Sequence, residues 1–445
     1  MNQHNKNPRR DFLKTSAILT GGAILSPFAM PGAYAAGSDV IKIAVVGCGG
    51  RGTGAVFQAL ATGHNIKLVA MADAFRDRLD KSYEPIAKKH PDMVDVPEER
   101  KFVGFDAYKE AIKLADVVLL TAPPGFRPAH FEEAVRQGKH VFLEKPVATD
   151  APGIRQVLAA AEIAKAKKLN VVAGLQRRYQ SNYLETINRI NDGAIGEVLG
   201  GQVFWNSGGV WVRPREAGQT EMEYQMRNWY YFNWLCGDHI VEQHVHNIDV
   251  ANWIKGSNPI KAEGTGGRMV RTGKDHGEIY DHHSIRFTYE DGTIINSECR
   301  HYPDADNRID ESFVGTKGKV YLNASNQGKI WSHDGKQLYN HDGTGNINPY
   351  QQEHNELFEA VSKGEFKYAD AERTAKSTMT AILGRLATYS GKEITWDEAI
   401  NSDLSLMPER LAWDALPKVL PDADGYYPHA IPGRTNVLSA IPSKT

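Results

Sequence analysis

The chain of 445 residues has little cysteine, little net charge and no long apolar run, and each scarcity excludes a class of protein. Its three cysteines are Cys48, Cys236 and Cys299, and none belongs to a CxxC pair. Three cysteines are too few for a disulfide framework and give no sign of a zinc site, so we expect reduced, inert thiols. A formal net charge of −2 provides no general basic field for nucleic acid. The composition is otherwise globular, with 41% hydrophobic and 24% charged residues, and the length suits two or three domains.

The first 35 residues resemble an export signal rather than part of a folded domain. Arg9-Arg10-Asp11-Phe12-Leu13-Lys14 is similar to a twin-arginine motif, and a weakly apolar stretch follows it to the cleavage-site pattern Ala33-Tyr34-Ala35. Glycines and prolines interrupt that stretch, so it suits a bilayer span poorly, and we expect no stable membrane insertion. We therefore predict a signal peptide at 1–35, export by the twin-arginine machinery, and a periplasmic protein. The alternatives are an uncleaved membrane anchor and a basic, unstructured N-terminus.

A glycine-rich turn between a strand and a helix predicts a dinucleotide site. Residues 40–46 form a short apolar run, Gly47-Cys48-Gly49-Gly50-Arg51-Gly52 follows at once, and residues 55–60 are typical of a helix. In such a unit the glycines allow a tight turn and close approach of the pyrophosphate, whose charge meets the free N–H groups of the helix N-terminus. The predicted cofactor contacts in this turn are Gly47, Gly49, Gly50, Arg51 and Gly52.

A second apolar run ends in a carboxylate that can select the cofactor. Asp73 follows Gly52 at about the 20-residue spacing at which a carboxylate accepts hydrogen bonds from the ribose hydroxyls. A negative charge there favours NAD, because it would repel a 2′-phosphate. Arg76 has the opposite effect, so NADP remains open.

Strands and helices continue to alternate up to Gln176, which indicates an open parallel sheet with right-handed crossovers. We expect a short strand and the start of a helix at 105–108, and further strands at 116–122, 140–143 and 170–176. Ligands bind at the carboxyl ends of such strands. The further predicted cofactor contacts at these ends are Pro123, Glu144, Lys145 and Gln176, which complete a Rossmann domain at 38–176.

Glu144-Lys145-Pro146 directly follows an apolar strand and places a lysine where it can exchange protons beside the nicotinamide. Together with the glycine-rich unit and the later Glu242-x-x-x-His246-x-x-Asp249, this motif resembles the Gfo/Idh/MocA oxidoreductase family over about residues 38–400. That family includes glucose-fructose oxidoreductase and inositol dehydrogenase. The resemblance implies an α/β fold, in which the Rossmann dinucleotide-binding domain is followed by a C-terminal α+β domain with a large, mostly antiparallel sheet. We place this second domain at 177–416.

The resemblance also implies catalytic roles for residues of both domains. Lys145 and His246 are expected to flank the reacting hydroxyl, with Lys145 as the acid/base. Glu242 and His246 are expected to lie one turn apart on the same helix. The family usually has Asp where this chain has Glu242, and commonly Gly where it has His244. We include Glu242 among the catalytic residues and hypothesise that His244 is an additional acid or base.

Histidines gather around this motif and admit a second interpretation. His239, His244 and His246 with Glu242 have the side-chain types of a metal cluster. The family's chemistry needs no metal, because the nicotinamide carries the hydride. We therefore predict no metal ion.

Several aromatic side chains are candidates for sugar binding. Residues 229–234 read Trp-Tyr-Tyr-Phe-Asn-Trp, which suits either a packed corner of the core or a stacking platform for the apolar face of a sugar ring. The predicted substrate contacts are Trp229, Tyr230, Tyr179 and His282. Residues 417–445 contain five prolines and are predicted to form an extended tail across the body or across a neighbouring subunit of a homodimer or homotetramer.

The sequence thus predicts an exported NAD(P)-dependent oxidoreductase that acts on a carbohydrate or polyol. The twin-arginine machinery carries folded proteins, and the periplasm offers no ready pool of NAD, so we expect the cofactor to be tightly bound and regenerated within the site. One alternative is an NAD-dependent glycoside hydrolase, in which a transient ketone allows elimination, water addition and re-reduction. The other is a non-catalytic nucleotide-binding protein, which would lack Lys145 or His246.

Overall fold

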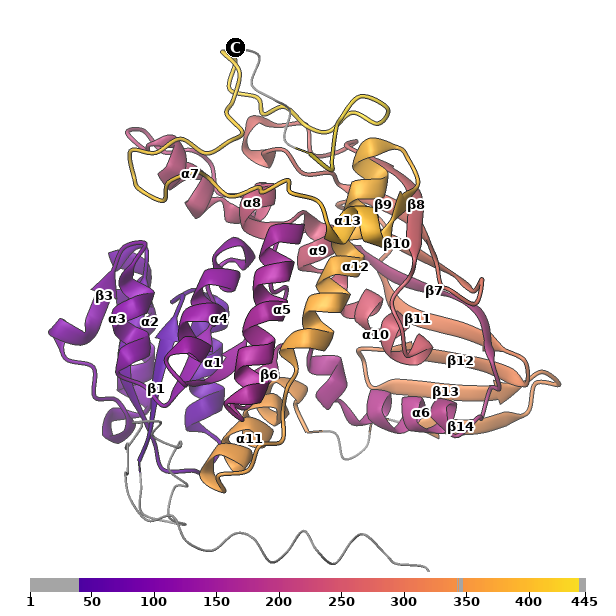
Figure 1. The fold of residues 1–445 in the computed structure, drawn as a ribbon, viewed down its shortest axis with the longest axis horizontal. Helices are drawn as coiled ribbons and strands as arrows, with labels where there is room; N and C mark the ends of the chain where they lie inside the picture. The colour runs from indigo at the N-terminus through magenta and orange to yellow at the C-terminus, as the bar shows by residue number, and fades with distance from the viewer. Residues whose placement is uncertain (1–39, 342, 344–346, 440–445) are drawn as a thin grey trace, which may run out of the picture. The chain divides into compact units, whose positions relative to one another are not determined.

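The structure, a computed structural model, describes residues 40–341, 343 and 347–439. It contains a six-stranded parallel sheet built from the N-terminal part and a nine-stranded mixed sheet built from the rest (Figure 1). The predicted signal peptide at 1–35 lies outside the described residues. Within the described ranges, no helix combines the length and apolar character needed to cross a membrane.

The six-stranded sheet has the strand order β3-β2-β1-β4-β5-β6. Its strands are β1 (Ile41–Val46), β2 (Ile66–Asp73), β3 (Lys101–Val103), β4 (Val117–Leu120), β5 (His140–Leu143) and β6 (Val171–Ala173). Apolar runs such as Val117–Leu120 are buried throughout, as expected of parallel strands covered on both faces. The order reverses between β1 and β4, where ligands bind in doubly wound sheets. The short strand predicted within 105–108 was misplaced, because β3 ends at Val103 and Gly104 turns the chain at φ 117°. The helix start predicted there is confirmed, because a helix begins at Ala107.

Helices cover both faces of this sheet (Figure 1). They are α1 (Gly50–Leu60), α2 (Arg76–Lys89), α3 (Ala107–Lys113), α4 (Arg127–Arg136) and α5 (Ala151–Ala166), with α11 (Pro349–Ser362) returning from the second half to pack against α1. Asp150 caps α5 by accepting a hydrogen bond from the Gly153 N–H at 2.8 Å.

The nine-stranded sheet has the order β14-β13-β12-β11-β7-β10-β9-β8-β15. The strands are β7 (Val198–Ser207), β8 (Lys261–Gly267), β9 (His282–Thr288), β10 (Ile294–His301), β11 (Arg308–Gly315), β12 (Gly318–Asn323), β13 (Gln327–Ser332), β14 (Gln337–His341) and β15 (Ile394–Thr395). Neighbouring strands of this sheet are antiparallel except for the parallel pair β7–β10. The predicted fold class is confirmed.

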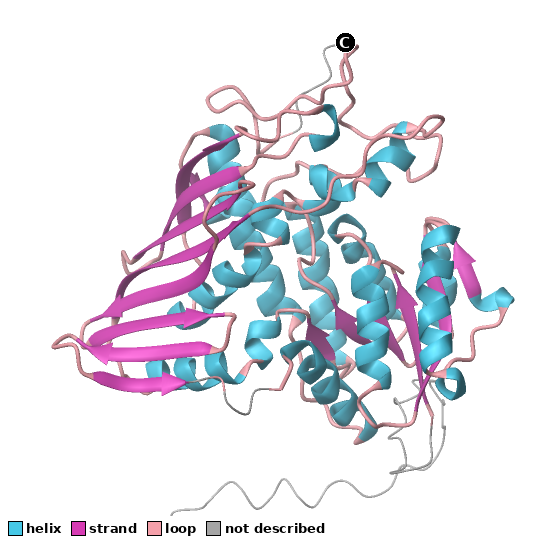
Figure 2. Ribbon diagram, turned by 180° about the vertical axis from the view of Figure 1, so that it is seen from behind, coloured by secondary structure: helices cyan, strands magenta, loops and turns pink. Residues whose placement is uncertain are grey.

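Helices lie between the two sheets, as Figure 2 shows from behind. Besides α11, the helices of the second half are α6 (Ser181–Asn191), α7 (Glu221–Arg227), α8 (Asn233–Cys236), α9 (His239–Glu242), α10 (Val245–Lys255), α12 (Ala371–Ser390) and α13 (Trp396–Ile400). The helix predicted through Glu242 and His246 is two helices, because the chain turns at Gln243 and His244 between α9 and α10. Glu242 therefore ends one short helix and His246 begins the next.

The chain after α13 is extended and packs on its own body. Tyr427 is buried in a hydrophobic cluster, the Tyr280 hydroxyl donates to the Ala430 carbonyl at 2.9 Å, and the Gly433 N–H donates to the Ser390 carbonyl at 2.7 Å. Figure 1 shows this yellow segment running past α7 and α8. Of the two predicted paths for the tail, its described part follows the one across the body.

Candidate active site

A cavity of about 600 Å³ opens where the carboxyl ends of β1, β2, β4 and β5 face the second half of the chain. Its lining begins at the glycine-rich turn, passes Asp73 and Pro123, and ends at Lys145, Glu242 and His246. The volume is in the range of cofactor and substrate sites. Residues far apart in the sequence thus share one continuous space.

The glycine-rich turn leaves room for a phosphate at its backbone. A Cβ on Gly47, which has φ 97°, would collide with Ala122, and one on Gly52 would collide with the Gly47 carbonyl. Gly49 and Gly50 instead face open space. The N-terminus of α1 has no side-chain cap and no acidic residue in its first turn, so its N–H groups are available to an anion. These features fit the pyrophosphate of a dinucleotide.

Asp73 lies beside the cavity where the ribose is expected. Its carboxylate accepts hydrogen bonds from the N–H groups of Cys48 at 2.7 Å and Phe75 at 2.8 Å, which fixes its orientation. Burial raises the pKa of Asp73, and these two hydrogen bonds oppose the rise. Arg76 is not in the lining: it is exposed and paired with Asp80 at 2.8 Å and with Glu98.

Arg78, two residues further along α2, lines the cavity in place of Arg76. The helix turns by about 100° per residue, so side chains two positions apart point to different sides. Sequence spacing identified a cation near Asp73 but not which arginine would face the ribose.

Arg51 and Glu144 connect the glycine-rich turn to the Lys145 turn. The Arg51 Nε donates to the Glu144 carboxylate at 2.5 Å, and the guanidinium stands 5.3 Å from the ring centroid of Tyr350. The Tyr350 hydroxyl accepts a hydrogen bond from the Gln176 side chain at 3.2 Å. Tyr350 lines the cavity but belongs to no motif, so no local pattern predicts it.

Lys145 is held by the opposite half of the chain. Its Nζ donates to the backbone carbonyl of Glu242 at 2.6 Å and lies 3.2 Å from the Glu242 Oε1. The Lys145 side chain is 12% exposed. The ammonium is therefore positioned at the seam between the two halves, with a carboxylate beside it.

Five buried atoms of lining residues find no hydrogen-bond partner within the described chain. They are the Glu242 Oε2, the His246 Nδ1, the Gln176 Oε1, the Arg127 Nε and the His130 Nδ1. Burial, followed by the charge of Lys145, holds the pKa of His246 well below its usual range, so this imidazole is neutral. Buried polar atoms normally have partners, so unpartnered atoms beside a cavity point to a polar ligand.

Aromatic side chains form the part of the cavity wall contributed by the second half. Trp205 stacks on His246 with a centroid distance of 5.9 Å, and Trp211 meets Trp229 edge to face at 5.8 Å. Trp205, Trp211 and Trp229 all line the cavity. Of the predicted aromatic substrate contacts, Trp229 is the one that the structure brings there.

Besides Gly52 and Arg76, four predicted site residues lie away from the cavity lining. Tyr230 is buried behind Trp229, with the two ring centroids 5.6 Å apart. The Tyr179 hydroxyl donates to Asp370 at 2.5 Å, the His244 Nε2 lies 2.8 Å from the Ser297 hydroxyl, and the His282 Nδ1 lies 2.8 Å from the Asp281 carboxylate. His244 lies in the turn after α9 and is buried beside Ser297 of β10, so the structure does not support it as an additional base.

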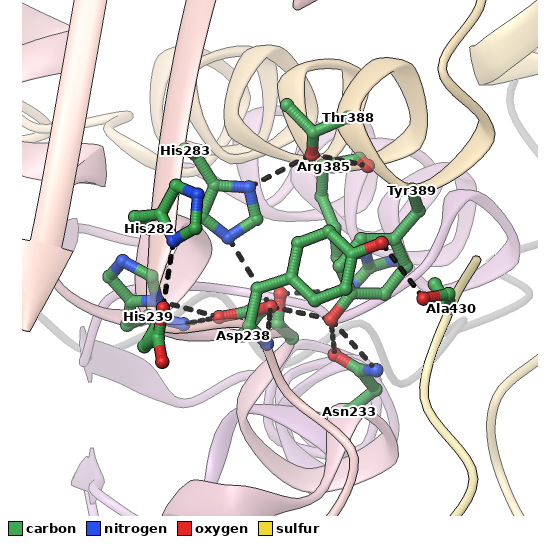
Figure 3. A network of polar contacts seen from close by, with 12 residues as sticks. Asn233, Asp238, His239, His282, His283, Arg385, Thr388, Tyr389 and Ala430 are labelled. Atoms are coloured by element: carbon green, nitrogen blue, oxygen red, sulfur yellow. Dashed lines mark hydrogen bonds and ion pairs between the residues drawn. The ribbon is translucent and has the colours of Figure 1, made fainter. Parts of the chain in front are cut away.

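Asp238 is the centre of a buried polar network behind α9 (Figure 3). Its carboxylate accepts hydrogen bonds from the His239 N–H at 2.5 Å, the His239 Nδ1 at 2.7 Å, the Tyr280 N–H at 2.9 Å and the Tyr389 hydroxyl at 2.5 Å. The His283 Nε2 lies 3.3 Å away. Burial alone would raise the pKa of Asp238, but the two histidines outweigh it and hold that pKa well below its usual range.

Ligand-type atoms of Asp238, His239 and His283 lie within 4.8 Å of one another. The carboxylate already receives four hydrogen bonds, which occupy about as many lone-pair sites as it has. We therefore interpret the group as a hydrogen-bonded hub that fixes α9 against β9 and α12.

Comparisons with known proteins agree with this geometry. A family model described as an oxidoreductase family with an NAD-binding Rossmann fold matches residues 41–173, and a model of the Gfo/Idh/MocA C-terminal domain matches 183–321. An inositol 2-dehydrogenase of Rhizobium meliloti (strain 1021) is 26% identical over 265 residues, which are 59% of this chain and 70% of that protein. A glycosyl hydrolase family 109 protein of Shewanella baltica (strain OS185) is 25% identical over 217 residues, which are 44% of this chain and only 45% of that protein.

Solved structures share the fold at low identity. An aldose-aldose oxidoreductase from Caulobacter crescentus, complexed with glycerol, has a TM-score of 0.61 at 17% identity and covers 80% of this chain and 100% of its own. An oxidoreductase from Agrobacterium radiobacter, in complex with NAD+, L-tartaric acid and magnesium, has a TM-score of 0.59 at 14% identity and covers 80% of this chain and 98% of its own. These likenesses establish the fold.

Proposed function

The chain belongs to the Gfo/Idh/MocA oxidoreductase family, and from this premise we propose that it transfers hydride between a carbinol of a carbohydrate or polyol and a tightly bound NAD. The observation that carries the proposal is the single cavity that joins the glycine-rich turn to Lys145, Glu242 and His246. One end offers backbone N–H groups to phosphate, and the other offers an ammonium, a carboxylate and a neutral imidazole to a hydroxyl. The inositol 2-dehydrogenase relative supports a polyhydroxy substrate.

The chemistry assigns a separate task to each side chain. When bound, the nicotinamide supplies the hydride acceptor or donor. Lys145, as the free amine, takes the proton of the substrate hydroxyl as the carbinol is oxidised, and as the ammonium it returns a proton on reduction. His246 hydrogen-bonds the same oxygen, while the Glu242 carboxylate keeps the Lys145 amine in place. Trp211 and Trp229, which contact each other edge to face, provide apolar ring surfaces for the C–H groups of a sugar ring.

We propose that the site prefers NAD to NADP, because the Asp73 carboxylate at the ribose position would repel a 2′-phosphate. Arg76 is paired with Asp80 and Glu98 on the surface, whereas Arg78 lines the cavity and would oppose this preference. We expect Asp73→Asn to weaken NAD binding by about tenfold and to reduce the preference for NAD over NADP, because a charged acceptor is lost. Titration of the protein with each nucleotide, followed by fluorescence of the reduced form, measures both effects. Arg76→Ala is the matched control, and a change in preference in that variant would contradict the assignment.

An assay without added cofactor tests the proposed function directly. The purified protein is denatured, the released nucleotide is identified, and intact protein is incubated with free aldoses, inositols and aryl glycosides. Lactone, ketone or polyol products support an oxidoreductase that recycles its own NAD. Absence of nucleotide binding, with or without added NAD, would overturn the proposal and the non-catalytic nucleotide-binding alternative together.

A redox-neutral glycoside hydrolase is the second candidate, and the glycosyl hydrolase family 109 relative favours it. In that reaction a transient ketone acidifies the neighbouring C–H, a base removes that proton, and the glycosidic leaving group departs before water adds and hydride returns. The unpartnered Glu242 Oε2 beside the cavity is a base available for this step. Release of phenol from aryl glycosides without any lactone would identify this reaction.

We also propose that the protein is exported by the twin-arginine machinery to the periplasm and acts there as a homo-oligomer. The Arg9-Arg10 pair supports the export route. Cell fractionation of the natural chain and of an Arg9→Lys, Arg10→Lys variant tests it: the variant is expected to stay in the cytoplasm. Light scattering of the purified protein tests the oligomeric state.

A further inference from the structure

The cavity continues beyond Asp73 into a part that the catalytic residues do not reach. This part is lined by Phe75, Gly104, Phe105 and Tyr108, which follow the ends of β2 and β3. A dinucleotide with its pyrophosphate at the glycine-rich turn and its nicotinamide beside Lys145 has its adenosine at this end. The two phenylalanines therefore form the wall against which the adenosine end would pack.

A tryptophan from the far end of the chain supports that wall from behind. The Trp413 ring lies 5.0 Å from the Phe75 ring and 4.7 Å from the Phe105 ring, measured between centroids, and both pairs are tilted. Trp413 itself is not among the lining residues and is 36% exposed. Phe75 is further covered by the Arg227 guanidinium, 4.1 Å from its centroid. Trp413 thus packs on both rings without lining the cavity itself.

The segment that carries Trp413 is fastened at both of its ends. The Lys418 Nζ donates to the Ser405 carbonyl at 2.7 Å and closes residues 405–418 into a loop. The Leu406 N–H donates to the Asp150 carboxylate at 2.7 Å, which ties the loop to the six-stranded half. The Gln225 side chain donates to the Val419 carbonyl at 2.8 Å, which ties it to α7. One loop therefore connects both halves across the adenosine end.

We propose that the loop 405–418 retains the adenine nucleotide and that Trp413 is its positioning residue, acting through Phe75 and Phe105. This inference rests on the proposed binding of NAD and assigns the C-terminal segment to its retention. Phe75 and Phe105 stand on turns after their strands, and without Trp413 both rings gain freedom to move away from the ligand. Loss of that support shortens the lifetime of the bound nucleotide, because departure of the adenosine end no longer requires the loop to open.

The test measures the release of NADH from the full-length protein. NADH is bound to the protein, excess NAD is added, and the decay of the NADH fluorescence gives the dissociation rate. We expect Trp413→Ala to raise this rate by about tenfold, the effect of losing two aromatic contacts, and Trp413→Phe to restore most of the retention. We expect Lys418→Met, which opens the loop without touching an aromatic ring, to change the rate in the same direction.

Leu416→Ala is the matched control, because Leu416 lies in the same loop and is 65% exposed. We expect its dissociation rate to equal that of the natural protein. An unchanged rate in both Trp413→Ala and Lys418→Met, with natural protein that binds NADH, would overturn the retention proposal and leave the proposed function intact. Failure of the natural protein to bind NADH at all would instead overturn the proposed function.

Discussion

Replacement of Lys145 by alanine is expected to lower kcat by about 10²- to 10⁴-fold, the usual contribution of a positioned acid or base. The amine lies at the seam of the cavity, 3.2 Å from the Glu242 carboxylate, and shares the cavity lining with His246. Because the glycine-rich turn and Asp73 make no contact with the Lys145 amine, nucleotide affinity is expected to remain within a few-fold of its natural value. Steady-state kinetics and NADH titration separate the two effects.

Two further variants make this result specific. Lys145→Arg keeps a positive charge, but a guanidinium does not exchange its protons near neutral pH. The kcat of this variant is therefore expected to fall nearly as far. Lys139→Ala removes a half-buried lysine next to the other end of β5 and is expected to leave turnover unchanged. Undiminished turnover in Lys145→Ala would remove the proposed mechanism.

The largest effect on stability is expected from Asp238→Asn. The Asp238 carboxylate is fully buried and receives hydrogen bonds from His239, Tyr280 and Tyr389. Breaking a buried charged network of this kind typically costs about 3–5 kcal/mol, because donors are left without an acceptor. Chemical denaturation, read as a shift of the transition midpoint, measures the loss.

Asp304→Asn is the matched control for this substitution. Both aspartates have a left-handed backbone, with φ 73° at Asp238 and φ 61° at Asp304, and asparagine tolerates that conformation. Asp304 is exposed, so its replacement is expected to shift stability by less than about 0.5 kcal/mol. Equal effects of the two variants would show that the backbone, and not the network, carries the stability.

The same carboxylate predicts how stability changes with pH. The folded-state pKa of Asp238 is depressed below its unfolded value, so its contribution is fully present above that unfolded value of about 4. It is lost as the pH falls through the folded-state pKa. Midpoints measured between about pH 3 and pH 6 are expected to fall more steeply for the natural protein than for Asp238→Asn.

The features that the sequence predicted well are those encoded by neighbouring residues. The glycine-rich turn, Asp73 and Lys145 each follow an apolar strand directly, and the parallel sheet fixes where such positions meet. His246 was placed through a family motif, and the cavity contains it. Each of these predictions depends on a chain segment of only a few residues and on the topology of the sheet.

The features that the sequence could not predict depend on rotation of a side chain or on distant contacts. His244 and His246 are two positions apart, and the turn between α9 and α10 directs the former to Ser297 and the latter to the cavity. Tyr350 and Trp413 reach the site from segments far along the chain, so no local pattern identifies them. Composition predicted an extended tail at 417–445, but its path across the body follows from individual contacts, such as that of the Ala430 carbonyl with Tyr280.

The anchoring of Lys145 couples chemistry to the closed arrangement of the enzyme. The amine comes from the six-stranded half, whereas both of its acceptors belong to Glu242 of the other half. A motion that separated the halves would therefore withdraw the Lys145 nitrogen from both acceptors. Under the proposed function, proton exchange at this amine would depend on the contact between the halves and would act as an interlock between catalysis and closure.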